Sequence, residues 1–128
     1  MTQNKRPLVL VIDDDAMVRD TISDILIEAD YDVILAPNGE AGLYMFDERN
    51  PGLVITDMIM PEKEGVETIV ELRRKNPNIP IIAISGGGRS GHLDFLKIAK
   101  IYGATTVLSK PLDMDDLAGA VRKFLPNT

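Results

Sequence analysis

The sequence predicts an α/β fold, with a doubly wound five-stranded parallel sheet of strand order 2-1-3-4-5 and five helices on its two faces. Two observations predict this fold. Five short runs rich in Val, Ile and Leu are continuously apolar, which is typical of strands covered on both faces. Segments with helical spacing separate these runs, and such alternation favours a parallel sheet with right-handed crossovers. The predicted strands are Leu8–Ile12, Val33–Ala36, Leu53–Ile55, Ile81–Ile84 and Thr106–Leu108.

Capping and stop residues bound the predicted helices between these strands. The side chains of Asp15, Asn38 and Asp113 are expected to cap the first, second and fifth helices. The second helix runs to about Arg49. Polar residues of the first helix, including Arg19, are predicted to form a solvated face. Stop signals end the second, third and fourth helices at Asn50-Pro51-Gly52, Asn76-Pro77 and Gly103.

Length and composition favour one soluble domain, residues 1–128. The chain has 14 Lys and Arg against 20 Asp and Glu, giving a net charge of −6. This charge argues against nucleic acid or an anionic membrane as a direct partner. The absence of cysteine excludes disulfides and thiolate chemistry. No apolar run approaches a transmembrane length and the first residues do not resemble a signal peptide, so we expect a cytoplasmic location.

Polar residues lie where the predicted strands end. Asp13-Asp14-Asp15 follows the first strand, Asp57 the third, Ser85 the fourth and Lys110 the fifth. Ligands of such sheets bind beyond the carboxyl ends, between strands 1 and 3. The carboxylates there repel one another, so Mg²⁺, Lys110 or both must neutralise them. A carboxylate beside Mg²⁺, an ammonium and a hydroxyl has the parts needed to accept a phosphoryl group.

The same residues, in this order, resemble the receiver domain of response regulators, and the resemblance covers essentially the whole chain. It implies a flavodoxin-like fold and a stand-alone, chemotaxis-type receiver in a two-component system or phosphorelay. The features that carry it are the pair Asp13-Asp14, the pattern D-x-x-M-P-x-x-x-G from Asp57 to Gly65, Ser85, and the pair Lys110-Pro111.

The resemblance implies a role for each site residue. Asp57 is the phospho-acceptor, and its carboxylate binds Mg²⁺ together with Asp14 and the backbone carbonyl of Ile59. Asp13 acts on the metal through water. The phosphoryl oxygens are held by Lys110 and Ser85, with the backbone N–H groups of Met58 and Gly86. Glycine at position 86 lets that N–H come close. The Lys110-Pro111 peptide bond is often cis in this family.

The resemblance also implies partners. The phosphoryl donor is a phosphohistidine on a sensor histidine kinase or a histidine phosphotransfer protein, and the first helix, with Met17 as a candidate contact, is expected to dock it. The signal passes to a downstream protein target through helix 4, strand 5 and helix 5. The chain is not expected to be an enzyme, since it catalyses only its own phosphorylation and dephosphorylation.

Three positions depart from the family pattern. The family usually has Tyr or Phe three residues before the lysine, where the ring rotates inward, but Val107 stands here. Movement is therefore expected of Ser85 and of the loop Gly86–Gly88. Ile59 and Gly87 replace polar side chains that can orient the attacking water, which predicts slow self-dephosphorylation.

Two other functions compete with this interpretation. A haloacid-dehalogenase-type phosphatase would use Asp13 as nucleophile and Asp15 as acid, although Met17 departs from its first motif. A degenerate receiver would serve only as an interaction module. The segment Gly86–Gly91 lacks the lysine and spacing of a nucleotide-binding loop. The sole histidine, His92, is expected at the surface.

Overall fold

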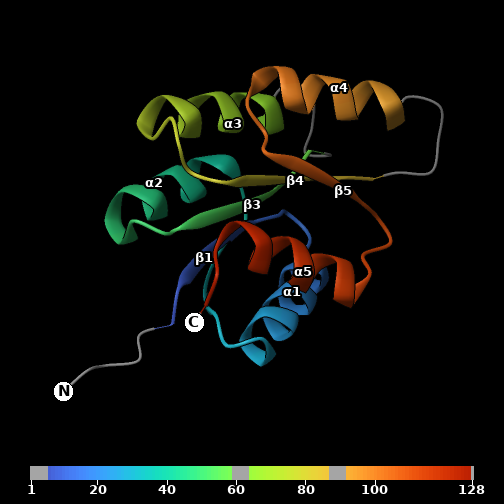
Figure 1. Cartoon of the computed structure of the whole chain (residues 1–128). Coiled ribbons are helices and arrows are strands. Elements are labelled where there is room, and N and C mark those ends of the chain that lie inside the picture. Colours follow the sequence, from blue (N-terminus) through green and yellow to red (C-terminus); the bar gives the residue numbers. More distant parts are fainter. Residues whose placement is uncertain (1–5, 59–63, 87–91, 128) are drawn as a thin grey trace.

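A five-stranded parallel sheet of order β2-β1-β3-β4-β5 forms the middle layer (Figure 1), and its strand order confirms the prediction. The structure, a computed structural model, describes residues 6–58, 64–86 and 92–127, and for residues 64 and 92–96 it describes the backbone alone. Its strands are β1 (Leu8–Ile12), β2 (Asp32–Ala36), β3 (Leu53–Asp57), β4 (Ile81–Ser85) and β5 (Thr106–Ser109). Its helices are α1 (Ala16–Glu28), α2 (Gly39–Arg49), α3 (Glu64–Lys75), α4 (His92–Tyr102) and α5 (Met114–Phe124).

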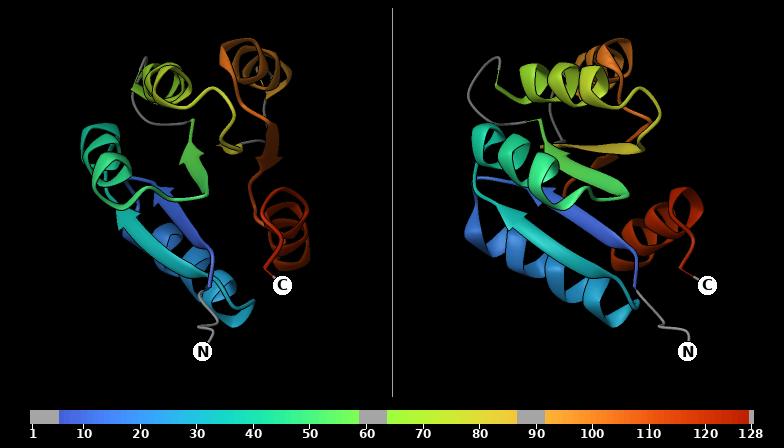
Figure 2. Two further views of the ribbon diagram at one scale, coloured as in Figure 1. Left: turned by 60° about the vertical axis from the view of Figure 1, so that its left-hand side comes forward. Right: turned by 90° about the vertical axis from the view of Figure 1, so that its left-hand side faces the viewer.

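Helices cover both faces of the sheet, with α2, α3 and α4 on one face and α1 and α5 on the other (Figure 1 and Figure 2). Successive residues of β1 alternate between the two apolar cores. Leu10 belongs to the core that contains Phe46 of α2 and Leu72 of α3. Val11 belongs to the core that contains Leu26 of α1. Because both faces are covered, the central strands are apolar along most of their length, which is the pattern that predicted them.

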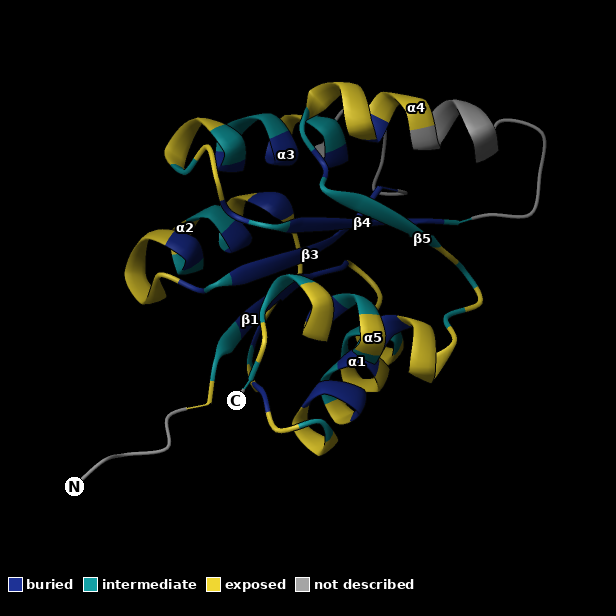
Figure 3. Ribbon diagram, in the orientation of Figure 1, coloured by how far each residue is buried: buried dark blue, intermediate teal, exposed yellow. Residues whose placement is uncertain are grey.

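Burial is greatest at the middle of the sheet. Figure 3 shows β3 and β4 buried along their lengths, whereas β5, at the sheet edge, is only partly buried. The structure extends four of the predicted strands: β2 begins one residue earlier, at Asp32, β5 ends one residue later, at Ser109, and β3 and β4 are also longer. β3 continues past Ile55 to include Thr56 and Asp57, and β4 includes Ser85. The backbone ladder continues through these polar residues, so their side chains stand on the sheet itself rather than on loops.

The predicted caps are confirmed. The Asp15 carboxylate accepts a hydrogen bond from the Met17 amide at 2.9 Å, and the Asn38 side chain accepts one from the Ala41 amide at 2.8 Å. The Asp113 side chain accepts hydrogen bonds from the amides of Asp115 and Asp116. The predicted stops also hold. α2 ends at Asn50, which has a φ of 51°, and α4 ends before Gly103, whose φ of 124° strongly favours glycine.

The guanidinium of Arg73, near the end of α3, joins loops at the end of the sheet opposite the strands' carboxyl ends. It donates hydrogen bonds to the Gly103 carbonyl in the α4–β5 turn, at 3.2 Å from Nε, and to the Pro77 and Ile79 carbonyls before β4, at 3.0 and 2.6 Å from Nη1. One side chain thus satisfies carbonyls of two loops, and that end of the sheet depends on it.

Replacing Arg73 should therefore destabilise the fold. Arg73→Met leaves several loop carbonyls without a charged donor, so we expect the free energy of unfolding to fall by about 2–4 kcal/mol. Urea denaturation followed by circular dichroism measures it. The matched control is Arg74→Met, because Arg74 is exposed and, among the described residues, its ion pair is with Glu71 at 3.0 Å. The control should change stability by less than about 0.5 kcal/mol. Equal losses in the two variants would contradict the assigned role.

Candidate functional site

The sheet register brings the predicted site residues to one end of four strands. Ile12 pairs with Thr56, so Asp13 follows β1 at the level where Asp57 ends β3. Asp57 pairs with Ile84, and Ser85 follows on β4. The Lys110 amide donates to the Ser85 carbonyl at 2.9 Å, which fixes the start of the β5–α5 loop beside β4. The carboxyl ends of parallel strands thus assemble the site.

Three carboxylates form an acidic cluster at this end of the sheet. Asp13, Asp14 and Asp57 each offer a carboxylate oxygen, and these oxygens all lie within 4.8 Å of one another. Asp13 and Asp57 are 1% and 2% exposed, whereas Asp14 is exposed. Two buried carboxylates at this spacing repel each other strongly, because little water screens them.

Lys110 partly neutralises the cluster. Its Nζ lies 3.4 Å from Oδ2 of Asp57 and 3.9 Å from Oδ2 of Asp13. The Lys110-Pro111 peptide bond is cis, as expected. One ammonium thus faces two buried carboxylates, and the site keeps an excess of negative charge.

Asp13 is held at almost every polar atom. Its amide donates to the Ala36 carbonyl at 3.1 Å, and its Oδ1 accepts from the Asp15 amide at 2.9 Å. Its Oδ2 is buried and has no hydrogen-bond donor among the described residues. The pKa of Asp13 is raised from 3.8 to about 6, chiefly because burial disfavours the charged carboxylate. The neighbouring Asp57 also raises this pKa, whereas the Asp15 amide and Lys110 act in the opposite direction.

The donor set fits Mg²⁺. A hard divalent cation prefers carboxylate and carbonyl oxygens and keeps positions for water and phosphate. The cluster supplies three carboxylates, one with an oxygen that no donor satisfies, and an uncompensated negative charge. The predicted ligands Asp13, Asp14 and Asp57 therefore lie together. The fourth, the Ile59 carbonyl, lies outside the described residues, as does Gly87.

One predicted phosphoryl donor is already hydrogen-bonded within the sheet. The Met58 amide donates to the Ile84 carbonyl at 2.8 Å, because the β3–β4 ladder continues one residue past Asp57. That N–H is therefore not free to bind an oxygen at the site. Ser85 is fully buried at the end of β4, and Gly86 follows it, so both lie where the sequence predicted. Val107 lies on β5, beside α4.

Arg19 does not lie free on a solvated helix face, although its position in the sequence predicts this. This residue was expected on a solvated helix face, but its Nη1 donates to the Asp13 carbonyl at 2.7 Å. The two residues are six positions apart, across the β1–α1 loop and the first turn of α1. A polar residue at a helical position outside the apolar stripe gave no signal of this contact, because the contact depends on how the loop turns.

Comparisons with known proteins agree with the geometry. A sequence model of the family described as "Response regulator receiver domain" matches residues 9–122. The chain is 30% identical over 118 residues to sporulation initiation phosphotransferase F of Bacillus subtilis, covering 92% of this chain and 93% of that protein. It is 31% identical over 117 residues to chemotaxis protein CheY of Listeria monocytogenes, covering 90% and 95%.

Solved structures agree with the fold. A response regulator receiver domain protein from Clostridium thermocellum superposes with a TM-score of 0.84 at 30% identity, covering 93% of this chain and 94% of that one. Chemotaxis protein CheY4 of Vibrio cholerae gives a TM-score of 0.84 at 25% identity, covering 94% and 99%. Across the described residues, no helix combines the length and apolar composition that crossing a membrane requires.

The raised pKa of Asp13 predicts a pH dependence of stability. Because this pKa rises from 3.8 to about 6 on folding, the folded state holds the proton more tightly between these values. The free energy of unfolding should therefore fall as pH rises through this window, by at most about 3 kcal/mol. In Asp13→Asn that fall should disappear, and the variant should be more stable than the parent above pH 7. Urea denaturation across this range, with chelator present, measures both effects.

The control is Asp24→Asn, which changes an exposed carboxylate of α1. It should keep the parent's pH dependence. A parent protein whose stability rises from pH 4 to pH 6 more steeply than that of Asp13→Asn would contradict the assigned direction.

Proposed function

The chain belongs to the response regulator receiver domain family and is a receiver domain of two-component signalling, and from this premise we propose that Asp57 is its phospho-acceptor. One observation carries the proposal. Asp57 ends the central strand β3, is almost fully buried, and lies both in the acidic cluster and 3.4 Å from Lys110. Members of this family are signalling switches rather than classical enzymes.

The chemistry we propose is transfer of one phosphoryl group. A carboxylate oxygen of Asp57 forms a bond to phosphorus while the bond between phosphorus and the donor's histidine nitrogen breaks, and that nitrogen keeps the electron pair and takes a proton. Lys110 pairs with a phosphoryl oxygen from the position it already holds beside Asp57. The Ser85 hydroxyl, on the neighbouring strand, donates a hydrogen bond to another phosphoryl oxygen. The Gly86 amide makes a third contact by donating to the phosphoryl group.

Mg²⁺ is the cofactor that the acidic cluster fits. When bound, it neutralises charge on the carboxylates and on the phosphoryl oxygens. Asp14 and Asp57 would hold it directly, with the Ile59 carbonyl, and Asp13 would hold it through water. The unsatisfied Oδ2 of Asp13 supports this assignment, because a water bound to the metal can donate to that oxygen.

We propose that the phosphohistidine donor docks beside the site, over α1 and the β5–α5 loop. A pocket of about 340 Å³ lies there, lined on one side by Met17, Val18 and Thr21 of α1, and on the other by Lys110, Pro111 and Leu112. Met17 is 79% exposed. An apolar side chain of the donor protein would fill this pocket and bring its histidine to Asp57. The donor would be a sensor histidine kinase or a histidine phosphotransfer protein.

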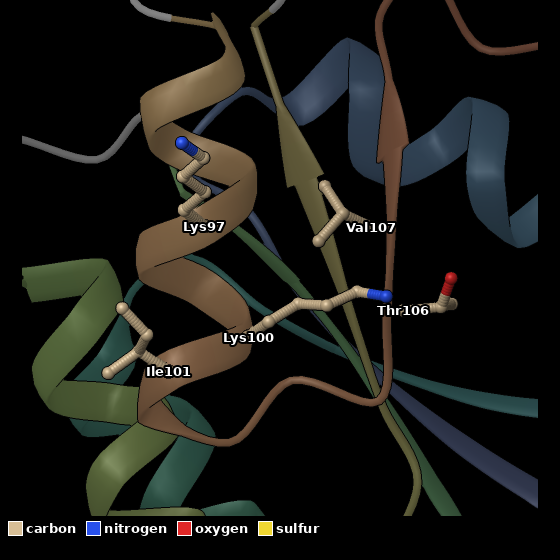
Figure 4. A pocket seen from close by; sticks show the side chains of 5 residues that line it. All are labelled: Lys97, Lys100, Ile101, Thr106 and Val107. Atoms are coloured by element: carbon tan, nitrogen blue, oxygen red, sulfur yellow. The ribbon is translucent and has the colours of Figure 1, made fainter.

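The downstream target is proposed to bind at the groove between α4 and β5 (Figure 4). This groove, of about 600 Å³, is lined by Lys97, Lys100 and Ile101 of α4 and by Thr106 and Val107 of β5. Figure 4 shows Val107 pointing towards α4 and Lys100 reaching across to β5. Both lysines are exposed, so a partner that combines acidic and apolar residues would suit the groove. Ser85 remains the proposed switch residue, because valine has no ring to rotate.

The phosphatase alternative is disfavoured by one contact. In that mechanism Asp15 would act as the acid beside the nucleophile Asp13. Here Oδ1 of Asp15 accepts from the Met17 amide as the N-cap of α1, which commits the side chain to the helix start.

Asp57→Asn should abolish phosphoryl uptake and keep the fold. The amide is nearly isosteric with the carboxylate but cannot form the acyl phosphate. Mass spectrometry after treatment with acetyl phosphate and Mg²⁺ measures incorporation, and borohydride trapping maps the modified residue. We expect one phosphoryl group, on Asp57, in the parent protein, and no acyl phosphate in the variant.

The control is Asp24→Asn, which should take up phosphate like the parent. An adduct that maps to Asp13 would instead support the phosphatase. A folded parent protein that takes up none would support a receiver that serves only as an interaction module.

Mg²⁺ should stabilise the protein through the acidic cluster. A ligand that binds only the folded state raises the free energy of unfolding by about 1–3 kcal/mol at concentrations from ten to a hundred times its Kd. Asp14→Ala should lose most of this gain, whereas Lys110→Met should keep it, because it removes a competing cation. Thermal denaturation with and without Mg²⁺ compares the three proteins. A gain of the same size in Asp14→Ala would exclude Asp14 as a ligand.

A further inference from the structure

We propose that Arg19 is a positioning residue for metal binding: through its hydrogen bond to the Asp13 carbonyl it fixes the Asp13–Asp14 peptide and so directs the Asp14 carboxylate into the acidic cluster. The inference rests on the proposed role of Asp14 as a ligand of Mg²⁺. It starts from the 2.7 Å bond between Nη1 of Arg19 and the Asp13 carbonyl oxygen.

Asp13 and Asp14 are held in different ways. Asp13 is buried and continues the ladder of β1, with its amide bonded to Ala36 of β2. Asp14 is exposed, and among the described residues its side chain accepts no hydrogen bond. Packing therefore fixes Asp13 but not Asp14. The direction of the Asp14 side chain depends on the backbone that carries it.

Arg19 acts on the backbone that carries the Asp14 side chain. The carbonyl of Asp13 belongs to the peptide plane that leads to Asp14, so a donor at this oxygen sets the rotation of the plane. Arg19 is anchored at its own end, because its amide donates to the Asp15 carbonyl at 3.0 Å within the first turn of α1. The Asp13-to-Arg19 segment is thus closed by two bonds from one residue. A helix that packs on the sheet then holds the loop rigidly.

A positioning role of Arg19 and a purely electrostatic role predict different effects on the affinity for Mg²⁺. The guanidinium is a cation near a site that binds a cation, so removing it would by itself strengthen Mg²⁺ binding. Removing a group that orients a ligand weakens metal binding instead, by about 10- to 100-fold when such supporting contacts are lost. The two roles therefore predict effects of opposite sign, and one measurement of affinity decides between them.

The test compares Mg²⁺ affinity by isothermal titration calorimetry in the parent and in three variants. Arg19→Met, which keeps the apolar stem but removes the donor, should raise the Kd for Mg²⁺ about tenfold. Arg19→Lys, which keeps a charged donor, should restore most of the affinity. Arg74→Met removes an exposed guanidinium of α3 and should leave the Kd for Mg²⁺ unchanged. An unchanged or lower Kd in Arg19→Met would overturn the proposal.

A second readout needs no metal. Amide hydrogen exchange, followed by NMR without divalent cations, reports the bond from the Asp15 amide to Oδ1 of Asp13. This exchange should be faster in Arg19→Met than in the parent, while amides of β3 keep their rates. Unchanged exchange at Asp15 would overturn the proposal even if Mg²⁺ proves not to bind the parent protein. Absence of Mg²⁺ binding in the parent, with faster exchange in the variant, would reject the metal site but not the role of Arg19 in holding the loop.

Discussion

The burial of two carboxylates beside one ammonium is the constraint on which this site depends. Asp13 follows β1 and Asp57 ends the neighbouring β3; both are almost inaccessible to water and share Lys110 at 3.9 and 3.4 Å. Such an arrangement is costly, because each carboxylate loses its hydration and one lysine cannot neutralise both. A cation bound among the carboxylates would lower this cost. A site that is destabilising when empty is selective for a ligand of high positive charge.

The sheet fixes the positions of the buried carboxylates and therefore the place where they repel each other. Backbone ladders hold Asp57 and Ser85 on β3 and β4, and both strands are covered by helices on each face. The Asp57 side chain therefore cannot move away from Asp13 by a loop movement. At the opposite end of the sheet, Arg73 joins the turns that lead into β4 and β5. That end is held by hydrogen bonds to neutral carbonyls, so the repulsion between like charges described here lies at the carboxyl ends of the strands.

Much of this arrangement could be predicted from the sequence, because it follows from local rules. Continuous apolar runs predict the strands, and the predicted strand order places Asp13 beside Asp57. Contacts that depend on the path of the backbone could not be predicted. The Met58 amide, a predicted phosphoryl donor, is hydrogen-bonded in the β3–β4 ladder. The turn after β1 brings Arg19 back to the Asp13 carbonyl. Residue types identify a site, but hydrogen-bond partners outside it depend on tertiary structure.

The direction in which a signal would leave the site follows from the placement of its cations and donors. A phosphoryl group on Asp57 would replace one carboxylate charge by roughly two. Among the described residues, the side chains proposed to respond to that extra charge are Ser85 at the end of β4 and Lys110 after β5, which the 2.9 Å backbone bond already links. Both lie on the same side of β3, towards the α4–β5 groove, and none of the responding groups is on β2. The added charge would thus act on the strands beside Val107, so the sheet order gives the response its direction.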